Sequence, residues 1–290
     1  MLDADILGVT VGGTSMQLET LLKRPNALPS APKTVRQLMG TFGREDVDVI
    51  LVAKLVQEDP VLVARLLKTA NSAYFGLRRS VGTVSEAINV LGVTKVRALV
   101  VAAALEQGFQ CVCGVNLGQF WRYSLSTAKF SHQIAAPTHL DEDTAFTAGM
   151  VHGIGELVMH VGMPEAMTEL DLSVPMLDLR RSAAEQERFG YSFAQVGAAL
   201  AAEWKFPSEM IGAIEFQTSP FGGGVHEPIA GVLHIASWRS RAQELSLGGD
   251  ALVNTYPDAV GVHLGLDPDI LIGDDMLLAA TQEAQPATVA

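Results

Sequence analysis

Hydrophobic residues recur at intervals of three and four along most of the chain, which places them on one face of an α-helix. The first half contains predicted helices at residues 15–22, 34–43, 47–58, 60–71, 83–91 and 94–108. The second half adds predicted helices at residues 116–136, 141–162, 175–189, 192–204, 207–216 and 228–245. No stretch alternates hydrophobic and polar residues with the period of two that a half-buried strand shows. We therefore predict an all-α fold.

Local signals mark several boundaries of these helices. Thr83 followed by Glu86 has the spacing of a capping box, in which side chains bond the free N–H groups at a helix start. The acids at residues 141–143 stand where a helix N-terminus favours negative charge. Residues 246–290 contain seven Asp or Glu and no Lys or Arg. We predict that this acidic C-terminal segment ends in a disordered tail.

Composition and charge exclude several classes of protein. Hydrophobic residues make up 48% of the chain, which argues against general disorder. The net charge of −12 makes the chain a poor partner for nucleic acid, because neutralisation of phosphates supplies most non-specific affinity. The apolar run at residues 98–105 is far too short to cross a membrane. The N-terminus lacks the basic region of a secretory signal, and the two cysteines, Cys111 and Cys113, imply no disulfide framework. We expect a cytoplasmic protein that binds neither nucleic acid nor membrane.

Three segments carry a resemblance to a known family. They are LPSAPKTVRQLM at residues 28–39, EDPVLVARLLKTANSAYFGL at residues 58–77, and TVSEAINVLGVTKVRALVV at residues 83–101. Together they resemble the HDOD family, a bacterial regulatory family related to the HD phosphohydrolases, and weaker similarity continues to about residue 245. The resemblance implies an N-terminal helical lobe, residues 28–113, packed on an HD-like helical bundle, residues 114–245. Residues 1–27 form a lead-in, and residues 246–290 follow the domain.

The NSAYFG element at residues 71–76 also has a purely physical interpretation. An amide side chain after an apolar helix can stabilise a turn. Two aromatic residues then supply buried area, and a glycine permits a left-handed backbone. We interpret the element as a structural connection between two helices.

The resemblance also implies where a metal site would lie. HD phosphohydrolases hold divalent metals with His and Asp side chains from several bundle helices, because the metal activates water and polarises phosphoryl oxygen. The defining His-Asp pair falls here at His152-Gly153, and glycine offers no ligand. The other expected ligand positions carry Tyr123, Phe193, Phe216 and Gln217. We therefore expect no catalytic residues, no bound metal and no cofactor.

Two functions follow from this interpretation. The first is a non-catalytic signal-transduction module that binds a protein partner, or a nucleotide, through the groove between the two lobes. The alternative is a degenerate metal-dependent phosphohydrolase acting on a nucleotide or cyclic dinucleotide. The candidate residues around the remnant site are His152, Glu156, Tyr123 and Arg122.

Charged side chains near the remnant site leave both possibilities open. His152 and Glu156 are four residues apart, which is a spacing that two-ligand metal sites use. Arg122 and Lys129 would contact phosphate in a metal-free nucleotide receptor, but we favour a solvated helix face for both.

Overall fold

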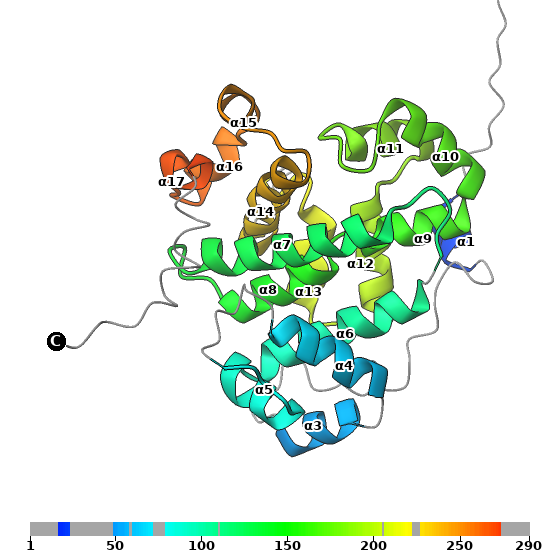
Figure 1. Cartoon of the computed structure of the whole chain (residues 1–290). Coiled ribbons are helices and arrows are strands. Elements are labelled where there is room, and N and C mark those ends of the chain that lie inside the picture. The colour runs from blue at the N-terminus through cyan, green and yellow to red at the C-terminus, as the bar shows by residue number, and fades with distance from the viewer. Residues whose placement is uncertain are drawn as a thin grey trace, which may run out of the picture.

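The computed structural model describes residues 17–23, 49–57, 60–71, 79–109, 111–204, 206–221 and 227–273. Helices joined by turns make up these ranges, and none of them contains a strand (Figure 1). The predicted all-α fold is therefore confirmed. Among the described helices, none combines the length and apolar character that a bilayer crossing requires. The predicted helix at residues 34–43 and the predicted disordered tail after residue 273 lie outside the described residues.

The described residues of a small N-terminal lobe form four helices. They are α3 (Val49–Gln57), α4 (Pro60–Ala70), α5 (Val84–Leu91) and α6 (Val93–Gly108). Helices α3, α4 and α5 pack on one another and on α6, and their apolar faces enclose side chains such as Val52, Leu62 and Leu66. The i, i+3, i+4 pattern of the sequence thus supplies the core of this lobe.

Side-chain hydrogen bonds hold the turns of this lobe. The Asn71 amide donates to the carbonyl of Val81 at 2.9 Å and accepts from its backbone N–H at 2.7 Å. These bonds confirm the structural interpretation of Asn71, while residues 72–78 lie outside the described ranges. The Thr83 hydroxyl accepts from the N–H of Glu86, as the capping-box spacing predicts. The Glu86 carboxylate reaches the N–H of Gly82 rather than that of Thr83.

A larger bundle follows the N-terminal lobe. Its central helix α7 (Leu117–Ala135) packs against α8 (Glu142–Val151) and α14 (Pro228–Glu244). Helix α12 (Phe193–Glu203) packs against α9 (Ile154–Gly162) and α13 (Ser208–Phe216). Helices α10 (Pro164–Ser173) and α11 (Arg181–Phe189) cover one end, and the short α1 (Leu18–Leu22) contacts α12 (Figure 1). Helix α6 packs on α8 and so joins the lobe to the bundle, in the arrangement the sequence predicts.

The described part of the acidic C-terminal segment is helical and packed. Helices α15 (Asp250–Thr255), α16 (Asp258–His263) and α17 (Pro268–Ile272) lie beside α14 (Figure 1). Leu252, Val260 and Leu271 are buried in the same core as α14. The Trp238 indole on α14 donates to the Thr255 hydroxyl at 3.0 Å. Residues 246–273 therefore extend the bundle, and the acids face solvent around this apolar contact.

Two predicted helices are shorter than the sequence pattern indicates. The predicted helix at residues 141–162 is wrong in its continuity, because it breaks at His152 and Gly153 into α8 and α9. Gly153 has φ −92° and ψ 4°, outside helical values, and glycine has low helix propensity. The predicted helix at residues 175–189 begins only at Arg181, because residues 176–180 form turns.

Glycines allow the bundle helices to approach closely at two places. A Cβ on Gly155 would lie 2.0 Å from the carbonyl oxygen of Phe193 and 2.7 Å from the nitrogen of Gly197. A Cβ on Gly149 would lie 2.7 Å from the Cα of Ala128. Backbone atoms cannot move aside as a flexible side chain can. The contacts of α9 with α12 and of α8 with α7 therefore depend on residues without a side chain.

We expect Gly155→Ala to lower the free energy of unfolding by about 3 kcal/mol or more, because the added methyl collides with the backbone of α12. Urea denaturation followed by circular dichroism measures this change. The control is Gly118→Ala on the exposed side of α7, where the nearest atom is a side-chain oxygen 3.4 Å away. That variant is expected to be neutral or slightly stabilising. Equal behaviour of the two variants would contradict the close-packing argument.

Candidate functional site

A tyrosine and a histidine meet in the middle of the bundle, at the place where the resemblance locates the metal site. Tyr123 comes from α7, and His152 follows the last residue of α8. Their ring centroids are 4.9 Å apart with an interplanar angle of 66°. Both side chains are buried, His152 completely and Tyr123 with 4% of its surface exposed. The structure therefore brings together two of the four candidate residues.

His152 is held as a neutral imidazole. Its Nδ1 is 2.7 Å from the carbonyl oxygen of Gly149, so this nitrogen carries the proton and donates. Burial lowers the pKa of His152 to about 3, with a smaller contribution from the positive charge of Arg241. Its Nε2 has no hydrogen-bond partner among the described residues, and neither has the Tyr123 hydroxyl. Burial raises the pKa of Tyr123, so its hydroxyl keeps its proton.

The side chains at the other expected ligand positions hydrogen-bond to the backbone or line a cavity. The Gln217 amide donates to the carbonyls of His152 at 3.0 Å and Ile214 at 2.8 Å. The backbone carbonyl oxygen of Gln217 lies 2.7 Å from Nδ1 of His234 on α14. Gln217 therefore fastens α13 to the break between α8 and α9. A Cβ on Gly153 would meet the ring of Phe120 at 3.3 Å, so this position faces packed side chains.

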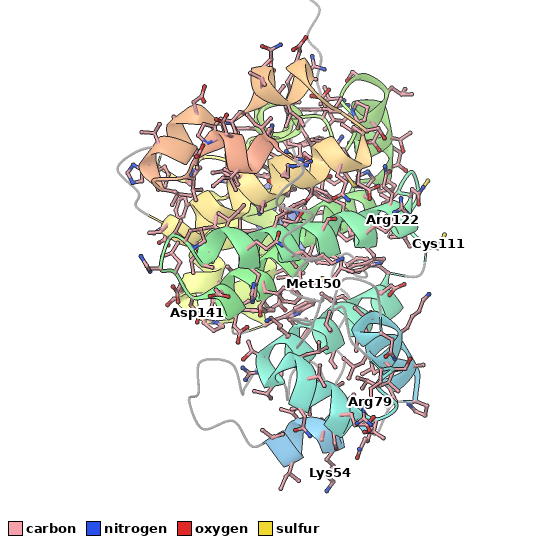
Figure 2. The ribbon with its side chains drawn as sticks, turned by 60° about the vertical axis from the view of Figure 1, so that its left-hand side comes forward. Lys54, Arg79, Cys111, Arg122, Asp141 and Met150 are labelled. Atoms are coloured by element: carbon pink, nitrogen blue, oxygen red, sulfur yellow. The ribbon has the colours of Figure 1, made fainter. Side chains whose placement is uncertain are left out.

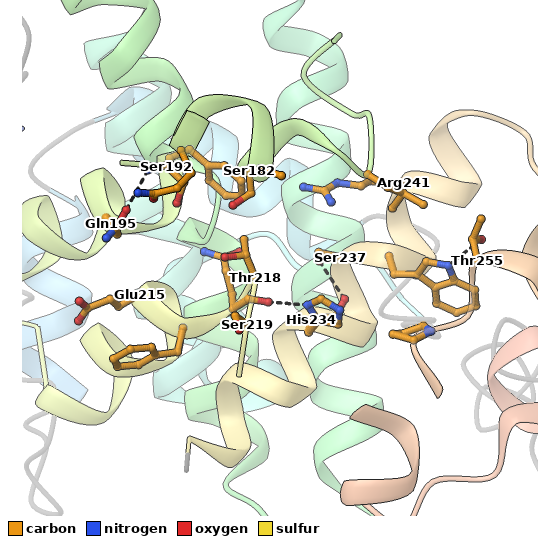
Figure 3. Close-up of a pocket in the computed structure, with 18 residues that line it drawn as sticks. Ser182, Ser192, Gln195, Glu215, Thr218, Ser219, His234, Ser237, Arg241 and Thr255 are labelled. Atoms are coloured by element: carbon orange, nitrogen blue, oxygen red, sulfur yellow. Dashed lines mark hydrogen bonds between the residues drawn. The ribbon is translucent and has the colours of Figure 1, made fainter. Parts of the chain in front are cut away.

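A cavity of about 570 Å³ opens beside this pair. Its walls come from α11, α12, the end of α13, and α14, with Thr255 and Pro257 at one edge (Figure 3). The lining includes Phe193, Phe216, Gln217, His234, Ser237 and Arg241. Three of these residues occupy predicted ligand positions, so the cavity takes the place of the metal site that the resemblance implies. Arg241 is a functional candidate that sequence analysis missed, because nothing in its local sequence distinguishes it from a surface arginine.

Glu156 lies elsewhere, in a buried cluster of charges around Arg181. The guanidinium of Arg181 is 3.2 Å from the Glu156 carboxylate, 2.7 Å from that of Asp171 and 2.8 Å from that of Glu185. Arg181 and Glu185 are fully buried, and Glu156 is 4% exposed. The break between α8 and α9 lies between His152 and Glu156, and the Glu156 carboxylate pairs with Arg181. Glu156 stabilises the bundle beside the cavity and does not extend the His152 site.

The cluster fixes one wall of the cavity, and its three carboxylates outnumber its one guanidinium. The second oxygen of Glu185 accepts the N–H of Phe193 at 2.7 Å, at the start of α12. His160, which the sequence leaves isolated, bonds the Asp171 carboxylate at 3.0 Å. Burial raises the pKa of Glu185 well above its ordinary value, and the charge of Glu156 adds to this. Burial lowers the pKa of Arg181, but Glu156 and Glu185 outweigh it and raise the pKa.

Arg122 lies on a different surface from His152. Its side chain is 64% exposed and pairs with Glu244 at 3.1 Å. With Met150 it lines a hollow of about 270 Å³ between α6 of the N-terminal lobe and α7. Figure 2 labels both residues. This hollow corresponds to the predicted groove between the lobes, and none of His152, Tyr123 or Glu156 lines it. The predicted groove and the remnant site are therefore two separate places.

Burial lowers the pKa of Lys129 to about 8.

Replacing Arg181 by Met is expected to cost about 3–5 kcal/mol of unfolding free energy, because three carboxylates lose their buried cation. The neighbouring Arg180 is 73% exposed and pairs only with Asp178 among the described carboxylates. Arg180→Met is therefore the matched control and should unfold close to wild type. Chemical denaturation at neutral pH compares the two. A small effect of Arg181→Met would show that the carboxylates find other compensation.

Acid should destabilise the chain through His152. The unfolded imidazole titrates near 6.5 and the folded one near 3, so the unfolded state binds more protons between these values. Stability therefore falls as pH falls, by about 2 kcal/mol from this residue between about pH 7 and pH 5. His152→Asn keeps an amide donor for Gly149 but cannot titrate, so its stability should fall less over that range. His139→Asn, at an exposed position with φ 58°, is the control. An unchanged pH slope in His152→Asn would contradict the assignment.

Comparisons with known proteins agree with this architecture. A proposed phosphohydrolase from Shewanella amazonensis has a solved structure that matches with a TM-score of 0.73 and 28% identity, over 91% of this chain and 95% of that one. An HDOD domain protein of unknown function from Geobacter sulfurreducens matches with a TM-score of 0.68 and 21% identity, over 89% and 92%. A proposed signal transduction protein from Marinobacter aquaeolei matches with a TM-score of 0.68 and 22% identity, over 92% and 61%.

Sequence comparisons agree with the structural ones. A curated, uncharacterized protein from Treponema pallidum is 24% identical over 232 residues, which are 79% of this chain. The chain spans 45% of that relative's length. The model of the HDOD domain family matches residues 28–220, which is more than half of the chain. The chain therefore belongs to the HDOD domain family.

Proposed function

We propose that this chain is a non-catalytic regulatory module of bacterial signal transduction that works in the cytoplasm by binding. Its partner is a protein or, as a second possibility, a nucleotide. The observation that carries the proposal is the content of the remnant site. His152 and Tyr123 still meet there, but Gly153, Phe193 and Gln217 occupy the positions where a metal would need ligands.

The chemistry of these side chains supports binding over hydrolysis. Metal-assisted hydrolysis needs an ion held by several donors, so that it can activate water and polarise the phosphoryl group. Nε2 of His152 is one available ligand atom for a metal. The side-chain amide of Gln217, by contrast, is engaged with two backbone carbonyls. Across the part of the chain that the structure describes, no group of three or more His, Cys, Asp or Glu is arranged to hold a metal ion.

The alternative function remains a metal-dependent phosphohydrolase acting on a nucleotide or cyclic dinucleotide. In its favour stands the 28% identity with the proposed phosphohydrolase from Shewanella amazonensis. Against it stand the apolar Phe193 and Phe216, since aromatic rings do not ligate hard cations. Arg122 also lies outside the cavity, so it is not placed to contact a phosphate near His152.

Metal analysis of the purified full chain tests the proposal. After incubation with manganese, iron, nickel or zinc and removal of excess ion, we expect far less than one ion per chain. We also expect no hydrolysis of bis(p-nitrophenyl) phosphate above the blank. His152→Ala should leave both results unchanged, and so should the control His132→Ala, whose imidazole pairs with Glu142. Stoichiometric metal that is lost in His152→Ala but kept in His132→Ala would overturn the non-catalytic proposal.

A further inference from the structure

Arg241 is a cation without a carboxylate partner on the wall of the 570 Å³ cavity. Within the described residues it forms no ion pair, whereas Arg122, Arg180, Arg181 and Arg188 of the same bundle each bond a carboxylate. The Arg241 Nε is buried and has no hydrogen-bond partner among the described residues. A buried polar atom without a partner is costly, so this half-buried cation on a cavity wall points to a bound counter-charge.

Two carboxylates lie near the cavity, but one pairs with another arginine and the other lies on the opposite wall. Asp178 is near enough for Arg241 to lower its pKa slightly, but Arg180 contributes most of that shift. The Arg180 guanidinium bonds both Asp178 oxygens, at 3.0 and 2.7 Å. Glu215 also lines the cavity, from the opposite wall (Figure 3). Neither carboxylate pairs with Arg241, so its charge is available to a ligand.

The surroundings of Arg241 disfavour a metal ion but offer hydroxyl groups for hydrogen bonding. The guanidinium lies over the Tyr123 ring, 5.9 Å from its centroid. The positive charge contributes to the lowered pKa of His152 and would repel a second cation from Nε2. The Tyr123 hydroxyl lies close enough to Arg241 and to the Ser237 hydroxyl for each of them to lower its pKa. Two hydroxyls therefore stand beside the cation.

The remaining walls fit a flat apolar group. Phe193 and Phe216 line the cavity on the side of α12 and α13, and Trp238 lines it on α14. Serine hydroxyls at Ser182 and Ser219 add polar contacts at its other edges (Figure 3). The volume of about 570 Å³ lies within the range of small-molecule sites. An apolar enclosure with one fixed cation is the composition of a site for an organic anion.

We propose that this cavity binds a small organic anion, with its phosphate or carboxylate group on Arg241 and its flat apolar part against Phe193 and Phe216. The inference rests on the proposed non-catalytic function and names the chemical class of its ligand. Arginine supplies the positive charge that a metal would supply in a hydrolase. Because planar guanidinium groups bind phosphate and carboxylate in the same two-pronged manner, the geometry of Arg241 selects the oxyanion and not its source.

The test measures binding of three probes to the full chain by ligand-observed NMR and calorimetry. Phenyl phosphate and benzoate carry the two oxyanions on one ring, and benzyl alcohol is the neutral analogue. We expect at least one anion to bind at millimolar concentration and benzyl alcohol to bind much more weakly. Arg241→Gln should weaken binding of the anion by about tenfold or more, because it removes a charge-assisted hydrogen-bonded pair. Whichever anion binds more tightly identifies the oxyanion.

Two further variants keep the test decisive. Arg122→Gln removes an exposed arginine that pairs with Glu244 outside the cavity, and it should bind as wild type does. Ser182→Phe fills the cavity without changing its charge and should also weaken binding of the anion. Circular dichroism establishes that each variant is folded. No binding of either anion to wild type, or equal binding by Arg241→Gln and wild type, overturns the inference.

Failure of the inference is distinguishable from failure of the proposed function. If no anion binds and no metal is found, the cavity proposal fails and the non-catalytic proposal stands. If phenyl phosphate is hydrolysed in the presence of a metal, the non-catalytic proposal fails. Binding of an unaltered anion that depends on Arg241 supports both.

Discussion

The buried guanidinium of Arg181 links four helices through one set of charged contacts. It bonds Asp171 of α10, Glu156 of α9 and Glu185 on its own helix, and Glu185 in turn bonds the first N–H of α12. Burying this many charges is favourable only when each finds its partner in good geometry. The wall of the cavity therefore inherits its shape from an electrostatic requirement, and helices α9 to α12 are held in a single arrangement.

Helical periodicity predicts most of this fold from the sequence. The apolar spacing in α4, α5 and α7 is strong, and the Thr83 hydroxyl caps α5 by accepting from a residue three positions along. Asn71 instead bonds Val81, ten residues along the chain. The break between α8 and α9 escapes prediction because the apolar pattern continues across it. Gly153 lies at the break, but Gly149 and Gly155 close to it are helical, so glycine alone does not locate the break. Tertiary bonds from Gln217 to His152 hold the chain at this point.

The site is less predictable than the fold for the same physical reason. Local spacing pairs His152 with Glu156, but a change of direction between them sends Glu156 into another cluster. Arg241 looks like one more surface cation in sequence, because only the fold shows that no carboxylate of the described residues pairs with it on the cavity wall. Residues 122 and 123 are adjacent, yet Arg122 faces the groove between the lobes while Tyr123 lies beneath Arg241. Sequence distance thus says little about which surface a residue serves.

The packing around Gly153 has a consequence for substitution at that position. Placing an aspartate there would restore the letters of the His-Asp pair, but its Cβ would press on the ring of Phe120 at 3.3 Å. A working pair would also need Phe120 to shrink or move, and Gln217 to release the carbonyl of His152. Each of these changes disturbs packing before any metal ligand is gained. An aspartate at position 153 could therefore be accommodated only together with changes at Phe120 and Gln217.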